Sequence, residues 1–117
     1  MARLAQLELE EMDGVTVASV DGEIDLSNAT ELEMAIANVV GNDALGLVVN
    51  LARVEYLDSS GVTLLFNLMR RVTRRQQRYA VVVPAEAHVH EILSLSGAAD
   101  TLPLHDSLDD ARRRLAD

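Results

Sequence analysis

The sequence predicts an α/β fold with a mixed sheet of about five strands and about four helices. Short apolar runs typical of buried strands alternate with segments in which apolar residues recur at helical spacing. This alternation favours parallel strands joined by right-handed helical crossovers, and an N-terminal hairpin adds one antiparallel pair. The 117 residues, of which 49% are hydrophobic, fit a single domain over residues 1–117 with a core at about residues 4–115.

The N-terminal segment predicts two antiparallel strands. Leucines alternate with glutamates within residues 4–11, as in a strand with one exposed face. Asp13-Gly14 is a turn signal, and residues 15–20 supply the returning strand. Residues 21–25, Asp-Gly-Glu-Ile-Asp, are rich in turn formers and predict a connection.

The middle of the chain predicts two helices on either side of a buried strand. Residues 28–40 place apolar side chains on one stripe, and Asn28 followed by Glu31 resembles a helix cap. Residues 45–51 form a short apolar run, which predicts a central strand buried on both faces. Residues 60–77 return to helical spacing with a broad apolar stripe.

The C-terminal part predicts a further strand, a helix, an edge strand and a last helix. Residues 79–83 are apolar and predict another buried strand. Pro84 is expected to open a third helix that ends at Gly97. Residues 101–104 contain a proline that suits an edge strand, and Ser107 is expected to open a last short helix.

The composition excludes several classes of function. The chain has no cysteine, which rules out thiolate nucleophiles, zinc–thiolate sites and disulfides. Its net charge of −9 disfavours nucleic-acid binding, and two Tyr, one Phe and no Trp are too few for a base-stacking surface. No segment reaches the roughly 20 apolar residues of a membrane span, and the N-terminus lacks a secretory signal. We therefore expect a cytoplasmic protein without membrane insertion.

Catalytic and metal-binding patterns find little support. His88 and His90 are too close in sequence to share a helical face, and His105 is distant, so we expect no metal site. Glycine-rich phosphate-binding loops are absent, and no cofactor is expected. A hydrolase acting through Ser59 is the enzymatic alternative. The sequence lacks a G-x-S-x-G elbow, and Asp58, directly before Ser59, is badly placed to orient a histidine.

Five arginines gather near the end of the second predicted helix. The first 69 residues carry 12 acidic residues and two arginines, whereas residues 70–117 carry eight arginines and seven acidic residues. Such a cluster is typical of a solvated helix end, where cations suit the helix dipole, and docking to an acidic partner is the alternative. The cluster comprises Arg70, Arg71, Arg74, Arg75 and Arg78.

The most informative segment is Asp58-Ser59-Ser60-Gly61, which lies between a buried strand and an apolar helix. Its Asp and Ser side chains are good helix caps, because their oxygens accept hydrogen bonds from free backbone N–H groups. The alternative is a functional serine, since the dipole and donors at a helix N-terminus favour an anion near Ser59. A phosphate there adds about −1.5 to −2 charge without breaking the helix, which suits a switch.

In this context the segment resembles the signature of the STAS domain, the anti-sigma factor antagonist family. Residues 22–25, Gly-Glu-Ile-Asp, are similar to the family's first loop motif, and residues 50–62 are similar to its strand–loop–helix core. Residues 93–97, Leu-Ser-Leu-Ser-Gly, are similar to a helix end in that family. The resemblance covers about residues 4–115, although Val62 stands where many relatives have Leu or Met.

The resemblance implies a STAS fold and a bacterial, non-enzymatic partner-switching protein that regulates transcription. Such a protein binds an anti-sigma factor, usually a GHKL-type serine kinase, and thereby frees a sigma factor. The kinase would phosphorylate Ser59 and break the complex, and a PP2C-type phosphatase would restore it. By the same resemblance Asp25, Asp58, Ser60 and Gly61 join Ser59 in the partner surface. The family also includes scaffold subunits of stress-sensing assemblies and accessory subunits of lipid-transport complexes.

Overall fold

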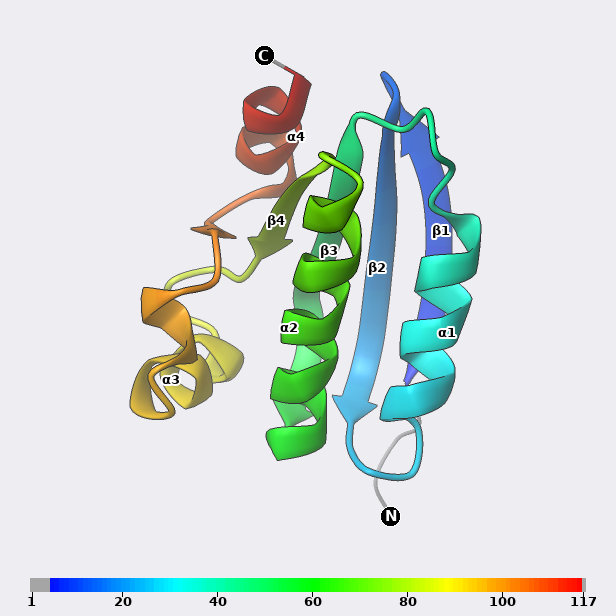
Figure 1. The fold of residues 1–117 in the computed structure, drawn as a ribbon. Coiled ribbons are helices and arrows are strands. Elements are labelled where there is room, and N and C mark those ends of the chain that lie inside the picture. The colour runs from blue at the N-terminus through cyan, green and yellow to red at the C-terminus, as the bar shows by residue number, and fades with distance from the viewer. Residues whose placement is uncertain (1–4, 117) are drawn as a thin grey trace.

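A mixed sheet forms the centre of the structure. The computed structural model describes residues 5–116 and contains a five-stranded sheet in the order β1-β2-β3-β4-β5 (Figure 1). β1 and β2 pair antiparallel and the other neighbours pair parallel, which confirms the predicted sheet with its N-terminal hairpin. The strands are β1 (Gln6–Met12), β2 (Val15–Ile24), β3 (Gly46–Leu57), β4 (Arg78–Val82) and β5 (Leu104–His105).

Helices cover both faces of this sheet. α1 and α2 lie side by side against one face, and α4 packs on the other (Figure 1). α3 contacts β3 and lies near the N-terminal end of α2. Within residues 5–116, no helix combines the length and apolar character that crossing a membrane would need. The helices are α1 (Ala29–Val39), α2 (Ser59–Arg74), α3 (His88–Leu95) and α4 (Leu108–Ala116), with a 3₁₀ turn η1 (Ala98–Asp100).

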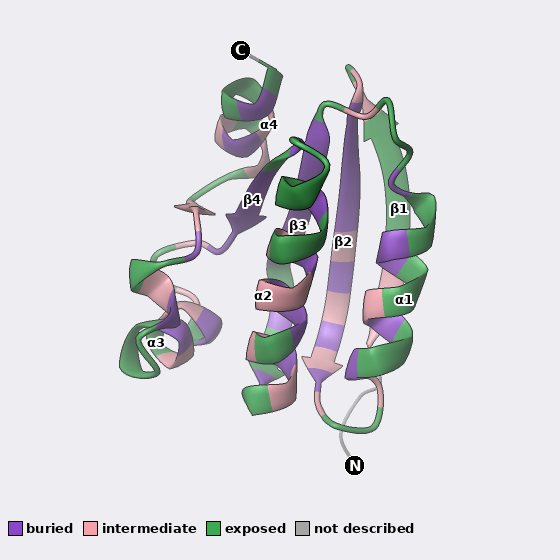
Figure 2. Ribbon diagram, viewed as in Figure 1, coloured by how far each residue is buried: buried purple, intermediate pink, exposed green. Residues whose placement is uncertain are grey.

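Alternation along the strands separates two apolar layers. In β3, Leu47, Val49 and Leu51 belong to the layer under α1 and α2, whereas Val48 belongs to the layer under α4. All four side chains are fully buried, which confirms a central strand buried on both faces. Figure 2 shows the contrast with the edge of the sheet, where β1 is mostly exposed.

The strands β2 and β3 are longer than predicted. The expected connection at residues 21–25 is wrong, because residues 21–24 continue β2 and pair with β3 as far as Ile24 opposite Leu57. Two register shifts in this stretch accommodate the turn-forming residues as irregularities within the strand. Residue 4, where the first strand is predicted to begin, lies outside the described residues, as do residues 1–3 and 117.

Helix ends also differ from the prediction. Asn28 directly precedes α1 as predicted, but its side chain makes no capping bond to the helix. The second helix ends at Arg74 instead of residue 77, since Gln76 takes a left-handed φ of 61°. The amide of the buried Gln77 then donates to the carbonyls of Gly41 and Ala44. These bonds fasten the end of α2 to the loop before β3.

The C-terminal elements follow the predicted order but differ from the prediction in length. α3 begins at His88 and not at Pro84, because residues 84–87 form a turn closed by the Ala87 N–H on the Pro84 carbonyl. The edge strand predicted at 101–104 reduces to two residues, Leu104 and His105. The cap predicted at Ser107 is confirmed, since its hydroxyl accepts from the Asp110 N–H at 3.1 Å.

Candidate functional site

Two acidic loops meet at the carboxyl ends of the central strands. Ile24, the last residue of β2, pairs with Leu57, the last residue of β3, so Asp25 and Asp58 follow neighbouring positions. The Asp58 N–H donates to the Ile24 carbonyl at 3.2 Å and ties the two loops together. Parallel pairing thus brings together two segments that lie more than 30 residues apart in the sequence.

Asp58 is the N-cap of α2. Its Oδ1 accepts from the backbone N–H of Ser60 at 2.8 Å and of Gly61 at 3.3 Å. The backbone at Asp58 is extended, as an N-cap requires, and the helix begins at Ser59. The capping interpretation of Asp58 is therefore confirmed, and these bonds fix the direction in which Ser59 leaves the sheet.

Gly61 lets this end of α2 lie directly on the sheet. A Cβ at this position would lie 2.8 Å from the Leu57 Cβ and 3.3 Å from the Ile24 Cγ2. Real Cβ atoms almost never approach at the shorter distance, so a larger residue would push the helix away from the strands. Gly61 is buried, and its place in the site is structural support for the helix start.

Ser59 is the exposed residue of the motif. It occupies the first position of α2, where the helix dipole favours negative charge. Across residues 5–116, no group forms a hydrogen bond with its hydroxyl. Ser60, the next residue, is half-buried. The serine that the motif singles out is therefore the more exposed of the two.

The Asp25 loop is held by its own polar side chains. Asp25 Oδ1 accepts from the Ser27 N–H at 2.9 Å and from the Ser27 hydroxyl. The Ser27 hydroxyl, followed by the Ser27 N–H, lowers the pKa of the Asp25 carboxyl. Asn28 closes the loop, because its Oδ1 accepts from the Asp25 N–H at 3.0 Å and its Nδ2 donates to the Glu23 carbonyl at 2.9 Å. These two bonds occupy the Asn28 side chain, which explains why it does not cap α1.

An open apolar hollow of about 450 Å³ lies beside Ser59. The sequence did not reveal this hollow, because α3 supplies one of its walls and the position of α3 follows from tertiary packing. Asp58 supplies the one carboxylate among the lining side chains, and its Oδ1 is engaged by the N–H groups of Ser60 and Gly61 as the cap of α2. Its lining comprises Tyr56, Leu57, Asp58, Ser59, Val62, Thr63, Ile92 and Ser96.

Exposed apolar residues surround the same end of the sheet. Leu26 in the Asp25 loop is 81% exposed and Leu95 at the end of α3 is 82% exposed. Tyr56, before Asp58, is 44% exposed and lines the hollow. Large apolar side chains exposed near one another, with polar groups around them, mark protein-interaction surfaces. In the sequence, the one sign of this apolar surface is Leu26, a leucine inside a polar turn.

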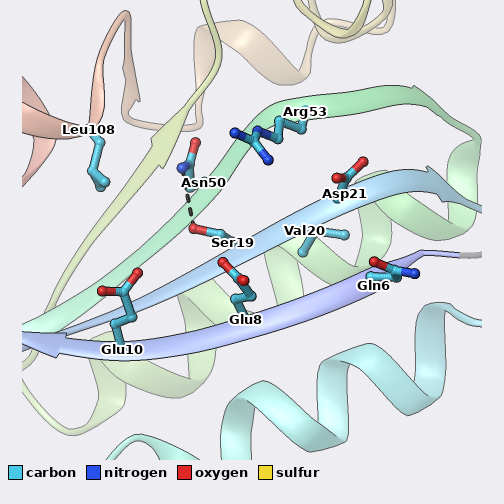
Figure 3. Close-up of a pocket in the computed structure, with 9 residues that line it drawn as sticks. All are labelled: Gln6, Glu8, Glu10, Ser19, Val20, Asp21, Asn50, Arg53 and Leu108. Carbon is cyan, nitrogen blue, oxygen red and sulfur yellow. Dashed lines mark hydrogen bonds between the residues drawn. The ribbon is translucent and has the colours of Figure 1, made fainter.

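A separate polar hollow of about 380 Å³ lies on the opposite face of the sheet. Figure 3 shows side chains from β1, β2 and β3 projecting toward it, with Asn50 Nδ2 donating to Ser19 Oγ at 3.3 Å. None of the predicted site residues lines this hollow. In residues 5–116, no group of three or more His, Asp or Glu side chains is placed to hold a metal ion. The lining comprises Gln6, Glu8, Glu10, Ser19, Val20, Asp21, Asn50, Arg53 and Leu108.

Comparison with known proteins agrees with the resemblance seen in the motifs. The STAS domain family model matches residues 6–111. The chain is 34% identical over 99 residues to the anti-sigma-F factor antagonist RsfB of Mycobacterium tuberculosis, covering 85% of this chain and 80% of RsfB. The crystal structure of an anti-sigma factor antagonist from Mycobacterium paratuberculosis superposes with a TM-score of 0.85 at 35% identity. That match covers 97% of this chain and 96% of the other.

A more distant structural match shows the fold alone. The Bacillus cell fate determinant SpoIIAA, solved in its phosphorylated form, superposes with a TM-score of 0.68 at 20% identity. The match covers 94% of this chain and 99% of SpoIIAA. The order of elements is therefore shared among chains whose sequences have largely diverged.

Proposed function

The chain belongs to the STAS domain family, and we propose that within this family it acts as an anti-sigma factor antagonist. In this role it binds an anti-sigma factor and so releases a sigma factor for transcription. Similarity to named antagonists over most of the chain supports the proposal. The protein contributes a binding surface to this process, and any nucleotide chemistry belongs to its partner.

The partner surface we propose is the carboxyl end of the sheet. It comprises the Asp25 loop, the segment from Asp58 to Gly61 and the apolar hollow beside them. Leu26 and Leu95 would supply apolar area at its rim, while Asp25 and Asp58 would supply charge. Interfaces commonly combine an apolar centre with a polar surround.

Ser59 is the proposed switch. The observation that carries this proposal is its exposure at the first position of α2, beside a hollow large enough for a partner side chain. A GHKL-type kinase partner would form a bond between Ser59 Oγ and the γ-phosphorus of ATP and release ADP. The hydroxyl proton would pass to a base on the kinase. A PP2C-type phosphatase would reverse the modification by hydrolysis.

A phosphate on Ser59 would remain directed at the partner. The N–H groups of Ser60 and Gly61 already bond to Asp58, so no free donor of that pair awaits the phosphate. The arginines at the other end of α2 begin about 16 Å away along the helix, beyond the screening length of about 8 Å. The added charge of about −1.5 to −2 therefore acts on whatever surface faces Ser59. A tenfold loss of affinity needs only about 1.4 kcal/mol.

The first experiment is affinity purification of the tagged protein from its native host, with mass spectrometry of its partners and of Ser59. A GHKL-type kinase recovered with a phosphorylated Ser59 fraction is the expected result. Membrane-transporter or stress-assembly subunits with unmodified Ser59 would instead place the protein among the scaffolding members of its family.

Titration calorimetry with the recovered kinase then tests the switch. Ser59→Ala should bind as the wild type does and resist phosphorylation, whereas Ser59→Asp should bind at least about tenfold more weakly. Ser60→Ala is the matched control, because it removes the neighbouring hydroxyl and should remain a substrate. Equal binding by Ser59→Asp and the wild type would show that charge at Ser59 does not control the complex.

A further inference from the structure

Arginine side chains line a groove at the C-terminal end of α2. The groove has a volume of about 380 Å³ and lies between α1 and α2, away from Ser59. Glu33 of α1 supplies its one acidic side chain. We call this feature the arginine groove, and its lining comprises Glu33, Asn67, Arg70, Arg71, Arg74 and Arg75.

The groove is positively charged, whereas the molecule as a whole is negatively charged. The chain carries 19 acidic and 10 basic residues, yet the groove gathers four arginines against one glutamate. Across residues 5–116, none of these four arginines forms an ion pair with a carboxylate. Glu33 is itself engaged, since its Oε1 accepts from Asn67 Nδ2 at 2.9 Å. The groove therefore keeps a net positive charge, since Glu33 offsets only one of its four arginines.

The spacing of the arginines is unfavourable for the isolated helix. Arg70 and Arg74 are four residues apart, as are Arg71 and Arg75, and like charges at this spacing repel on a helix surface. The helix dipole favours cations only in the last turn, and Arg70 lies before it. A carboxylate placed between these side chains would turn the repulsion into attraction.

Two of the four arginines are held in position. Arg70 donates to Asn67 Oδ1, so a chain of hydrogen bonds links Arg70 through Asn67 to Glu33. Arg75 Nη1 donates to the Val40 carbonyl at 3.0 Å. Anchored guanidinium groups lose little conformational freedom on binding and present paired N–H donors that match a carboxylate.

We propose that the arginine groove is a second protein-docking site, which binds a carboxylate-rich segment of a partner protein. Charge complementarity selects an acidic occupant, and the planar donors of arginine suit carboxylates. A nucleic acid fits less well, because its phosphates would extend beyond the groove over a molecule of net charge −9. A second copy of the chain would offer the polar hollow of Figure 3, which includes Glu8 and Glu10. Two copies that each carry a net charge of −9 would repel each other.

The site is independent of the proposed switch. Arg70 lies about 16 Å from Ser59 along α2 and Arg74 lies about 22 Å away, so a segment can occupy the groove while the Ser59 end is free or bound. Ser59→Asp should therefore leave binding at the groove unchanged. This separates a failure of the docking proposal from a failure of the switch.

The test uses a fluorescent synthetic peptide of alternating glutamate and glycine, followed by anisotropy at low salt. The double variant Arg71→Gln/Arg74→Gln removes the two arginines of the groove whose side chains form no hydrogen bond within residues 5–116. It should bind the peptide at least about fivefold more weakly than the wild type. The control Arg113→Gln/Arg114→Gln changes the net charge equally on α4 and should stay within about twofold.

Four results would overturn the proposal. The acidic peptide does not bind, or the groove and control variants lose affinity equally. A single-stranded oligonucleotide of equal charge binds more tightly than the peptide and loses that affinity in the groove variant, which would make the site a polyphosphate site. Sedimentation shows self-association of the wild type that the groove variant abolishes, which would make a second copy the occupant.

Discussion

Replacing Gly61 by alanine tests how closely α2 must approach the sheet. The new methyl group would lie 2.8 Å from the Leu57 Cβ, about 0.6 Å short of the 3.4 Å at which ordinary contact begins. The Leu57 Cβ is attached to the backbone of the central strand and cannot rotate away. The Ile24 Cγ2, at 3.3 Å, closes the other side. Relief therefore requires a movement of the helix start.

Two opposing effects set the expected magnitude. Alanine is a better helix former than glycine by up to about 1 kcal/mol, which stabilises the variant. Overpacking of this kind costs about 1–3 kcal/mol. The steric effect should win, and Gly61→Ala should lose about 1 kcal/mol of unfolding free energy. Movement of the helix start should also weaken the two hydrogen bonds to Asp58.

Urea unfolding followed by circular dichroism measures the change, since the chain has no tryptophan to report by fluorescence. Hydrogen exchange at the N–H groups of Ser60 and Gly61 measures the weakened cap, and exchange there should accelerate. Ser60→Ala is the matched control, because it changes helix propensity in the same turn without adding atoms, and it should stay within about 0.5 kcal/mol. An increase in stability for Gly61→Ala would refute the reasoning, because it would mean that the strands yield to the methyl group.

Two further predictions concern Tyr79 and Asp58. Burial raises the pKa of the Tyr79 hydroxyl above the ordinary value of 10.0, and this hydroxyl donates to the Leu65 carbonyl at 2.8 Å. The unfolded state then loses its proton first, so unfolding free energy should fall above pH 10.0 by up to about 1.4 kcal/mol per pH unit. Tyr79→Phe should lower the unfolding free energy by about 1 kcal/mol at neutral pH and should flatten its fall at alkaline pH. Urea titrations at several pH values measure both effects. If the unfolding free energies of the variant and the wild type fall in parallel above pH 10.0, Tyr79 is not the group responsible. Asp58→Ala should lower the unfolding free energy by about 1 kcal/mol in the same assay. Asp58→Asn should lower it clearly less, because the Asn side-chain oxygen can still accept from the Ser60 N–H. Equal losses for the two variants would show that the cap depends on charge alone.

Much of the fold could be predicted because its signals are local. The apolar run at residues 45–51 identified the buried centre of β3, and Asp13-Gly14 identified the hairpin turn. Both residues of that turn have positive φ, as its geometry requires. The start of α2 was equally readable, because a capping side chain acts on N–H groups only two or three residues away.

The element ends that were mispredicted depend on competing hydrogen-bond partners. Residues 21–24 look like a turn in isolation, but β3 offers them hydrogen-bond partners, and the ladder continues. Asn28 looks like a helix cap, but its amide instead spans the turn from Asp25 to Glu23. In the first case a contact far along the chain outweighed a local preference. In the second, two hydrogen bonds to nearby residues competed with the cap.

The sequence by itself determined the type and order of the elements and the motif around Ser59, because apolar periodicity and capping act over a few residues. Only the tertiary structure decided that Asp25 lies beside Asp58, since that proximity follows from the pairing of Ile24 with Leu57. Packing likewise brought Ile92 of α3 to the hollow beside Ser59 and set Glu33 of α1 opposite the arginines of α2. Such surfaces join residues far apart in the chain, and burial of the apolar core between them fixes their relative position.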